Sequence, residues 1–196
     1  MDILFWSGGK DSFLALEFYR QEYGTRPLKL LTTYEQGKEI VPHQNIALKD
    51  IKKQALELGL DLLTVPLPNN CPNDLYLEKL EEVFQKEPEP VQHLVFGDWK
   101  NEELRNWRAS VFGAMGYTCL FPIWQKSLHD LLPVLLFKPI KVEISAVREE
   151  FRPYLRVGET YDQQLVRQLP REIDPMGENG EFHTKVIFRD LNEEVV

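Results

Sequence analysis

Cysteine is scarce in this sequence: the 196 residues include two, Cys71 and Cys119, which lie far apart. Neither has a second cysteine at the short spacing that zinc and iron–sulfur sites use, so such sites are not expected. A small fold held together by disulfides is also excluded, and two unpaired thiols are typical of a reducing cytoplasm. Both cysteines are expected to be buried or incidental.

Long hydrophobic runs are missing as well. No window approaches the roughly 18–20 apolar residues that a membrane-spanning helix needs. The longest apolar cluster, at residues 128–137, is interrupted by Asp130 and Pro133. The first residues also lack the basic region and apolar segment of a signal peptide. We therefore expect a cytoplasmic protein that has no membrane partner.

The sequence also has no excess of positive charge. The 23 basic residues are outnumbered by 31 acidic ones, which gives a net charge of −8. A broad nucleic-acid surface needs clustered Lys and Arg, so nucleic acid is not expected as a partner, although a local basic groove stays open. The hydrophobic content of 43% and charged content of 28% are typical of a globular enzyme.

The most informative stretch is at the beginning of the chain. Residues 2–6 are expected to form a buried strand, and an apolar run typical of a helix opens at Phe13. Glycines let the backbone turn sharply, and the first amides of a helix can bind an anion. A lysine there is disfavoured by the helix dipole by about 0.3–1 kcal/mol unless an anion is bound. The residues between strand and helix therefore predict a phosphate-binding loop: Ser7, Gly8, Gly9, Lys10, Asp11 and Ser12.

Two common phosphate motifs do not fit this loop. The Walker A pattern would need a glycine at Leu4 and a Ser or Thr at Asp11. The dinucleotide-binding pattern fails because no further glycine follows Gly9 at the required spacing. The sequence S-G-G-K-D-S after a strand instead resembles the loop of the PP-loop ATP pyrophosphatases, which cleave ATP between the α and β phosphates and adenylate a substrate. An ordinary glycine turn, with the helix capped by Asp11 or Ser12, is the alternative, but it leaves Lys10 unexplained.

Short apolar segments alternate with helical periodicities up to about residue 126. This pattern predicts βαβ units, and hence an α/β fold with a doubly wound, mostly parallel sheet and helices on both faces. Ligands bind such sheets at the carboxyl ends of the strands, where Thr33, Gly97 and Asp98 fall. The expected strands are residues 28–33, 62–65, 94–96 and 117–121, and the expected helices are residues 13–23, 45–58, 73–85 and 101–115.

The pattern changes after residue 126. We predict a PP-loop ATP-binding domain over residues 1–126 and a smaller C-terminal substrate-binding lobe over residues 127–196. A polar stretch at residues 174–184 precedes a strand-like segment that opens at Lys185. This stretch is expected to return toward the ATP site.

That last stretch carries a more specific resemblance. Together with the first loop, G-E-N-G-E-F-H-T at residues 177–184 resembles the diphthine–ammonia ligase family. Gly97-Asp98 followed by Arg105 and Arg108, and F-P-I-W at residues 121–124, are similar to the family's middle segments. The chain is most similar to the stand-alone bacterial ATP-binding branch, whose last motif is D-P-C-G-E-N-G-E-F-H-T. Met176 stands where that motif has its cysteine.

The resemblance implies a fold of the adenine nucleotide alpha hydrolase (HUP) type and an ATP-dependent amidation. A carboxylate attacks the α-phosphate, pyrophosphate leaves, and ammonia or an amine displaces AMP from the acyl-adenylate. The implied cofactors are ATP and Mg²⁺. The implied partners are a small-molecule or protein-borne carboxylate with ammonia or an amine, and the oligomeric state, a homodimer included, stays open.

The resemblance also implies roles for single residues. Lys10, Glu181 and His183 are the implied catalytic residues, and Asp98 is the implied magnesium ligand. The implied nucleotide-binding residues are Ser7, Gly8, Gly9, Lys10, Asp11, Ser12, Thr33, Gly97, Asp98 and Arg105. The implied substrate-binding residues are Trp124, Glu178, Asn179, Gly180, Glu181, His183 and Thr184.

Plainer interpretations stay open for several of these positions. Asp98 would also stabilise a turn, Arg105 would also be a solvated helix residue, and Trp124 would also fill a core. His43 is a further candidate for ligand contact, and Trp107 is expected in the core. Two other functions also stay open: a PP-loop enzyme that modifies tRNA, and a module that binds ATP without catalysis.

Overall fold

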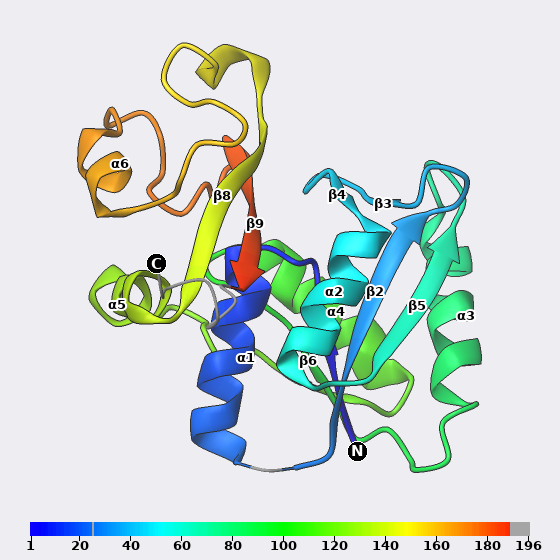
Figure 1. Ribbon diagram of the computed structural model, residues 1–196. Helices are drawn as coiled ribbons and strands as arrows, with labels where there is room; N and C mark the ends of the chain where they lie inside the picture. The colour runs from blue at the N-terminus through cyan, green and yellow to red at the C-terminus, as the bar shows by residue number, and fades with distance from the viewer. Residues whose placement is uncertain (25, 189–196) are drawn as a thin grey trace.

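The computed structural model describes residues 1–24 and 26–188. Strands and helices alternate along most of its length, and a separate two-stranded sheet follows (Figure 1). The strands are β1 (Asp2–Phe5), β2 (Leu28–Glu35), β3 (Ile40–Val41), β4 (Ile46–Ala47), β5 (Leu62–Leu67), β6 (His93–Val95), β7 (Thr118–Leu120), β8 (Ile140–Val147) and β9 (Phe182–Phe188). The helices are α1 (Lys10–Tyr23), α2 (Leu48–Leu58), α3 (Asn73–Phe84), α4 (Glu102–Ala114), α5 (Leu128–Phe137), the 3₁₀ turn η1 (Glu149–Phe151) and α6 (Gln163–Gln168).

The central sheet has its parallel strands in the order β5-β2-β1-β6-β7, and the β3–β4 hairpin extends it from the end of β2. Numbered by chain position among the parallel strands, the order is 3-2-1-4-5, as in a doubly wound fold. The order reverses between β1 and β6, and ligands bind beside such a reversal at the carboxyl ends. The predicted fold class, a doubly wound and mostly parallel α/β sheet, is confirmed.

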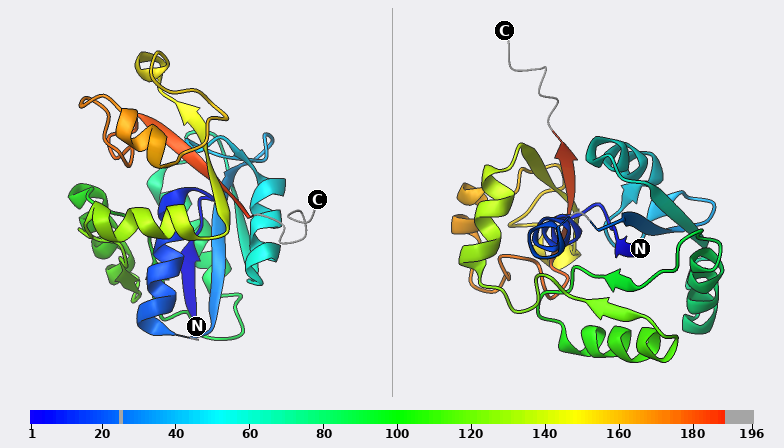
Figure 2. Two further views of the ribbon diagram at one scale, coloured as in Figure 1. Left: turned by 60° about the vertical axis from the view of Figure 1, so that its left-hand side comes forward. Right: turned by 90° about the horizontal axis from the view of Figure 1, so that it is seen from below.

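Alternation along β1 explains why helices cover both faces of this sheet. Successive side chains of a strand point to opposite faces. Ile3 and Phe5 join the hydrophobic cluster formed with α3 and α4, whereas Leu4 and Trp6 join the cluster formed with α1 and α2. Figure 2 shows the two helix layers on either side of the strands. Ile3 and Leu4 are both fully buried, and burial of each contributes about 1.5–3 kcal/mol.

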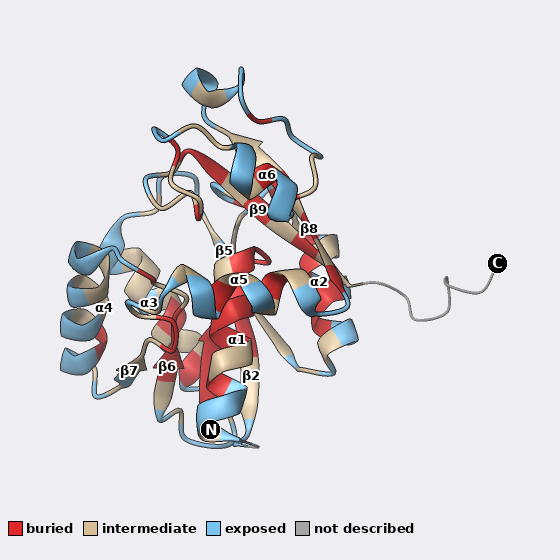
Figure 3. Cartoon of the chain, turned by 90° about the vertical axis from the view of Figure 1, so that its left-hand side faces the viewer, coloured by how far each residue is buried: buried red, intermediate tan, exposed pale blue. Residues whose placement is uncertain are grey.

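The second sheet, β8 antiparallel to β9, is built onto the α1 and α2 side of the first. Val142 of β8 and Val186 of β9 belong to the same hydrophobic cluster as α1, and Figure 3 shows this shared layer in red. The Val186 amide also donates a hydrogen bond of 2.9 Å to the Gly8 carbonyl. The end of the described chain is thereby fixed beside its beginning. The division into domains at residue 126 stays a prediction, and residues 189–196 of the predicted lobe lie outside the described residues.

The connection between β2 and α2 differs from the expectation of a plain loop followed by a helix from residue 45. It forms the β3–β4 hairpin, and α2 begins at Leu48. Asn45 has a φ angle of 54° and His43 one of 65°. These left-handed conformations close the turn and are incompatible with a right-handed helix, so the helix starts later.

Strand β5 also runs further than expected, through Pro66 to Leu67. It pairs with β2 alone among the described strands, so it lies at an edge of the parallel sheet. A proline is tolerated at an edge because its missing N–H leaves no partner strand unpaired. Within residues 1–24 and 26–188, no helix is long and apolar enough to cross a bilayer.

Candidate functional site

A cleft lies at the carboxyl ends of β1 and β6, where the strand order reverses. It consists of a wide cavity of about 450 Å³ and an adjoining narrow cavity of about 210 Å³. The wide cavity falls within the roughly 300–1,000 Å³ of small-molecule sites. The residues that line both cavities are Ser7, Asp11, Gln44, Gly97, Asp98 and Leu104.

The two cavities differ in chemistry. The wide cavity has walls of mixed polarity: Phe5, Trp6, Leu31, Val41, Pro42 and Tyr76 line it together with polar residues that include the predicted Thr33. The narrow cavity is polar and is bounded by two segments that are far apart in the sequence. Gly9 and Lys10 lie on one side, and Glu178, Gly180, His183 and Thr184 lie on the other. The cleft can therefore accept a flat group with both apolar faces and polar edges in its wide part and a charged group in its narrow part.

The loop between β1 and α1 is shaped by its two glycines. Gly8 has a φ angle of 80°, which favours glycine, and a Cβ on it would lie 2.5 Å from Ile51 Cδ1. A Cβ on Gly9 would lie 2.9 Å from the carbonyl oxygen of Thr184. Both glycines therefore let the loop pack closely against α2 and β9, so they serve the protein's own packing.

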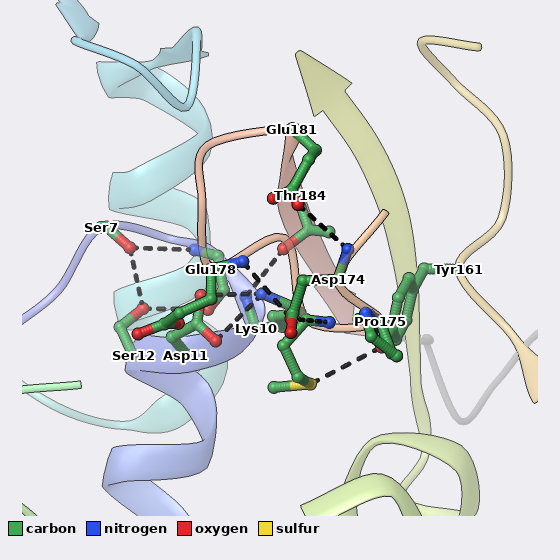
Figure 4. A network of polar contacts seen from close by, with 12 residues as sticks. Ser7, Lys10, Asp11, Ser12, Tyr161, Asp174, Pro175, Glu178, Glu181 and Thr184 are labelled. Carbon is green, nitrogen blue, oxygen red and sulfur yellow. Dashed lines mark hydrogen bonds and ion pairs between the residues drawn. The ribbon is translucent and has the colours of Figure 1, made fainter. Parts of the chain in front are cut away.

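Lys10 is the first residue of α1 and is 2% exposed. Its Nζ lies 2.9 Å from Asp11 Oδ2, so the adjacent carboxylate balances its charge (Figure 4). This pairing gives Lys10 a counter-charge within the protein, and binding of an anion by Lys10 stays a prediction. Lys10 nevertheless lines the narrow cavity, where a phosphate would compete with Asp11 for the ammonium group. Neither Asp11 nor Ser12 is the N-cap of the helix, because that position is Gly9, which has no side chain to accept a hydrogen bond.

The amides expected to receive an anion are partly engaged by protein groups. The Lys10 N–H donates to Thr184 Oγ1 at 3.0 Å, and the Gly9 N–H donates to Ser7 Oγ at 3.4 Å. The Ser12 hydroxyl donates to the Gly9 carbonyl at 2.9 Å. Thr184 is 2% exposed and therefore acts as a fixed acceptor for the start of α1. The substrate-binding role implied for Thr184 stays a prediction, and its observed contact joins β9 to the loop.

Glu181 is 1% exposed, and its carboxylate is turned into its own loop. It accepts hydrogen bonds from Asp174 N at 3.0 Å, Asn179 N at 2.9 Å and Asn179 Nδ2 at 3.0 Å. Burial would raise the pKa of Glu181, but these donors outweigh it and hold the pKa below its usual value. Neither Glu181 nor Asn179 lines either cavity of the cleft. In the structure, Glu181 therefore holds the loop of residues 174–181 together through these hydrogen bonds, and its catalytic role stays a prediction.

Glu178 lies on the cleft and joins the last loop to α4. Its Oε1 accepts hydrogen bonds from the backbone amides of Lys100 at 2.9 Å and Asn101 at 3.1 Å. Asn101 is the N-cap of α4, so the carboxylate sits at the positive end of the helix. Burial raises the pKa of Glu178 despite the Lys100 hydrogen bond. Glu178 closes one side of the narrow cavity.

Asp98 and Arg108 form a charge pair at the end of β6. Arg108 Nε lies 3.2 Å from Asp98 Oδ2, and both atoms are buried and make no hydrogen bond with another described residue. Burial raises the pKa of Asp98, an effect that Arg108 opposes and Asp11 reinforces. A Cβ on the preceding Gly97 would lie 2.8 Å from the Asp11 backbone, so glycine lets β6 end directly against α1.

Arg105 and Trp124 lie together but outside both cavities. The Arg105 guanidinium carbon is 4.8 Å from the centre of the Trp124 ring, typical of a cation–π contact. Arg108, one turn further along α4, lines the wide cavity instead. Trp107, expected in the core, is half-buried and contacts the Tyr76 ring at a centroid separation of 6.5 Å.

His43 and His183 face each other across the cleft, with ring centres 6.2 Å apart. His43 lines the wide cavity and His183 the narrow one. Burial, Lys10 and His43 lower the pKa of His183, and Asp11 opposes them more weakly. His183 is therefore neutral at pH 7, a form that can accept a proton.

The donor set of the cleft fits a nucleotide bound with magnesium. Its cavities are lined by three carboxylates, those of Asp11, Asp98 and Glu178, and by two cations, Lys10 and Arg108. A triphosphate alone would meet a net negative surface, so a divalent cation would have to accompany it. Mg²⁺ takes one or two carboxylates plus phosphate oxygens, which Asp11 and Asp98 can supply. No cluster of three or more His, Cys, Asp or Glu residues occurs in the described part of the chain, so a site made of protein ligands alone is not observed there.

Sequence reasoning missed Gln54 as a supporting residue. Its Nε2 donates to the carbonyls of Gly8 at 3.0 Å and Val186 at 2.7 Å, and its Oε1 accepts from Trp6 Nε1 at 2.8 Å. Gln54 thereby ties together β1, the loop and β9. The only signal in the sequence is its spacing of three residues from Ile51, which places a polar side chain on the buried face of α2. Gln44, which lines both cavities, was also missed.

The fold and the cleft define the class of protein. It is an α/β protein with a charged loop at the point where the strand order of a doubly wound sheet reverses. No family model matches the sequence, and no curated protein matches it. Among solved structures, the chain is similar to the U34-tRNA thiolase NcsA from Methanococcus maripaludis, with 14% identity, a TM-score of 0.43 and coverage of 68% of this chain. It spans 55% of that thiolase chain.

A second similar structure is a predicted subunit of a tRNA methyltransferase from Methanocaldococcus jannaschii. The match covers 100% of both chains at 15% identity, with a TM-score of 0.47. Similarity of this degree, in both cases, does not extend to activity, substrate or partner.

Proposed function

We propose that this protein is an ATP-dependent adenylating enzyme of the PP-loop type, with a fold of the adenine nucleotide alpha hydrolase type. The observation that carries the proposal is the cleft at the strand reversal. It places the S-G-G-K-D-S loop and the G-E-N-G-E-F-H-T loop on opposite sides of one polar cavity, beside a wider cavity of mixed polarity. We infer that the adenine occupies the wide cavity and the phosphates the narrow one.

The residues of the cleft suit cleavage between the α and β phosphates. Lys10 would leave Asp11 and neutralise the charge that builds on the departing pyrophosphate, with Arg108 as a second cation. Magnesium, when bound, would supply the further positive charge that this neutralisation needs. Asp11 and Asp98 would hold the metal, since both carboxylates line both cavities. Neutral His183 would accept the proton of an incoming amine.

In the first half of the reaction, we propose that this cleavage results from attack of a carboxylate on the α-phosphorus. The bond from the α-phosphorus to the bridging oxygen breaks, pyrophosphate leaves, and an acyl-adenylate forms. Ammonia or an amine then attacks the acyl carbon, AMP leaves with the electron pair of the broken C–O bond, and the amine loses a proton. This is the amide-forming activity that the resemblance to the diphthine–ammonia ligase family implies.

Modification of tRNA is the second candidate, because both similar structures are of proteins named for tRNA modification. Their names fit this candidate at least as well as they fit amide formation. Thiolation chemistry that depends on cysteine has little support in this chain, because neither Cys71 nor Cys119 lines the cleft. Burial also raises the pKa of Cys119 to about 11, which keeps this thiol protonated. A non-catalytic ATP-binding module is the third possibility.

One assay separates these functions. The protein is incubated with ATP, Mg²⁺ and ammonia, with either a carboxylate library or unmodified tRNA, and AMP and ADP are quantified. We expect AMP and pyrophosphate, dependent on a carboxylate. Dependence on tRNA would select the second candidate, nucleotide binding without turnover would select the third, and ADP with phosphate would refute the proposal.

The nucleotide site is tested separately with Lys10→Met. Loss of a charge-assisted contact is expected to weaken binding of a non-hydrolysable ATP analogue by roughly 10- to 100-fold in calorimetry. Lys52→Met is the matched control, because Lys52 is exposed on α2 away from the cleft. Equal affinities of wild type and Lys10→Met would contradict the assignment of the loop.

A further inference from the structure

A third cavity, of about 480 Å³, lies next to the cleft, on the other side of the start of β9. We call it the arginine cavity. Its lining residues come from the β3–β4 turn, from β8 and from the segment after η1: Asn45, Ser145, Ala146, Val147, Arg152, Leu155, Arg156 and Val157. Figure 1 shows the chain after β8 extending beyond the second sheet, with β3 and β4 nearby.

The arginine cavity combines an anion-binding set with an apolar wall. Arg152 pairs with Glu149 at 2.8 Å, but both side chains are exposed, and such surface pairs are weak. The Arg156 guanidinium has no ion pair or hydrogen bond with any residue among 1–24 and 26–188. Ala146, Val147, Leu155 and Val157 supply the apolar surface. This chemistry suits an acid that has a hydrocarbon segment.

Ser145 gives the cavity a polar atom without a partner. The pairing of β8 with β9 shifts register between Ile144 and Ala146, so Ser145 is the extra residue of a β-bulge. Its Oγ is buried and makes no hydrogen bond with another described residue. An unpaired buried hydroxyl destabilises a fold, so a hydroxyl retained at a cavity is expected to have a ligand partner.

The arginine cavity and the cleft are separated by one pair of residues. Ala146 of β8 is paired with His183 of β9, and Ala146 lines the arginine cavity while His183 lines the narrow cavity of the cleft. In the β3–β4 turn, Asn45 lines the arginine cavity, whereas the adjacent Gln44 lines the cleft. Because Ala146 is paired with His183 and Asn45 directly follows Gln44, the two sites lie side by side, within the reach of a short hydrocarbon chain.

We propose that the arginine cavity binds the acceptor of the adenylation reaction, and that this acceptor is a small dicarboxylic acid. Arg156, Arg152 and Ser145 hold one carboxylate, and the apolar residues cover the hydrocarbon segment. The other carboxylate extends into the adjacent cleft, where it attacks the α-phosphorus and pyrophosphate leaves. The reaction of the second carboxylate rests on the proposed function, whereas binding of the acid in the arginine cavity does not.

Binding is tested without nucleotide, so that failure of this proposal is distinguishable from failure of the proposed function. Glutarate and pentanoate have the same number of carbons, but glutarate has a carboxylate at both ends. Calorimetry is expected to show glutarate binding at least tenfold more tightly than pentanoate. Arg156→Gln is expected to weaken the binding of both acids by roughly 10- to 100-fold, because each places a carboxylate at Arg156. Arg167→Gln, on exposed α6, is the matched control.

Ser145→Ala separates a ligand-binding hydroxyl from a structural one. If Ser145 binds the acid, the variant binds glutarate more weakly but unfolds at the same or a higher temperature, because an unpaired buried hydroxyl is removed. A lower melting temperature with unchanged glutarate affinity would assign the hydroxyl to the fold and overturn this part of the proposal.

The final measurement uses turnover with ATP, Mg²⁺, ammonia and a series of dicarboxylates. We expect Arg156→Gln to raise the KM for the acid at least tenfold and to leave the KM for ATP unchanged. An unchanged KM for the acid in an enzyme that still forms AMP would overturn the arginine cavity and leave the proposed function intact. Absence of AMP with every acid, together with tight binding of glutarate, would overturn the proposed function and leave the arginine cavity as a binding site.

Discussion

Replacing Glu181 by Gln separates a structural from a catalytic role for this residue. The carboxylate accepts three hydrogen bonds from Asp174 and Asn179 and is 1% exposed. Gln retains one acceptor oxygen and places an NH₂ donor against groups that are themselves donors. A hydrogen bond to a charged group contributes about 1.5–3 kcal/mol, so loss of one or two predicts a decrease of about 2–5 kcal/mol in the free energy of unfolding.

This decrease is measurable by thermal and urea unfolding. For a chain of this length, about 1 kcal/mol corresponds to a shift of roughly 2–4 °C in Tm, so Glu181→Gln should melt about 4–20 °C lower. Glu172→Gln, at an exposed position near the same loop, should be within about 0.5 kcal/mol of wild type.

The pH dependence of the difference gives a second readout. The pKa of Glu181 is lower in the folded protein than its usual value of 4.5. Its contribution is therefore fully present above that value and is lost as pH falls through the lowered folded-state pKa. The stability gap between wild type and Glu181→Gln should accordingly narrow at low pH. An unchanged Tm, accompanied by a loss of AMP formation greater than 100-fold, would refute the structural role and restore the catalytic one.

Three further predictions follow from the same cleft. Gly97→Ala should lower Tm and weaken ATP binding at least tenfold, because its Cβ would lie 2.8 Å from the backbone of Asp11. Gly113 lies on α4 with open space around it, so Gly113→Ala should instead raise the free energy of unfolding by about 0.4–1 kcal/mol. Equal effects of the two substitutions on Tm and on ATP affinity, both measured by calorimetry, would contradict this prediction. The pKa of His183 is lowered by burial and by Lys10, so its neutral form stabilises the fold above pH 6.5, and this stability should decline relative to His183→Gln as pH falls below 6.5 in urea unfolding. Finally, ATP should raise Tm in the presence of Mg²⁺ and lose most of that effect with EDTA, since the cleft has more carboxylates than cations; an EDTA-insensitive shift would exclude metal-assisted binding.

The sequence determined the fold class because local patterns were sufficient for it. Apolar strands alternating with amphipathic helices leave few packings other than a doubly wound parallel sheet. The glycine loop after β1 was also recognisable, since glycines between a strand and a helix have strong conformational consequences. The position of the cleft then followed from the rule that ligands bind at the carboxyl ends of the strands.

Only the tertiary structure decided what each side chain of the two loops contacts. Lys10 pairs with Asp11, Thr184 accepts from the first amide of α1, and Glu181 satisfies its own loop. Residues 174 positions apart in the sequence meet in the second of these contacts. No local pattern encodes such partners, because they depend on how β9 docks against α1. The sequence thus indicated where the chemistry lies, and long-range packing decided which residues face the cleft and which support it.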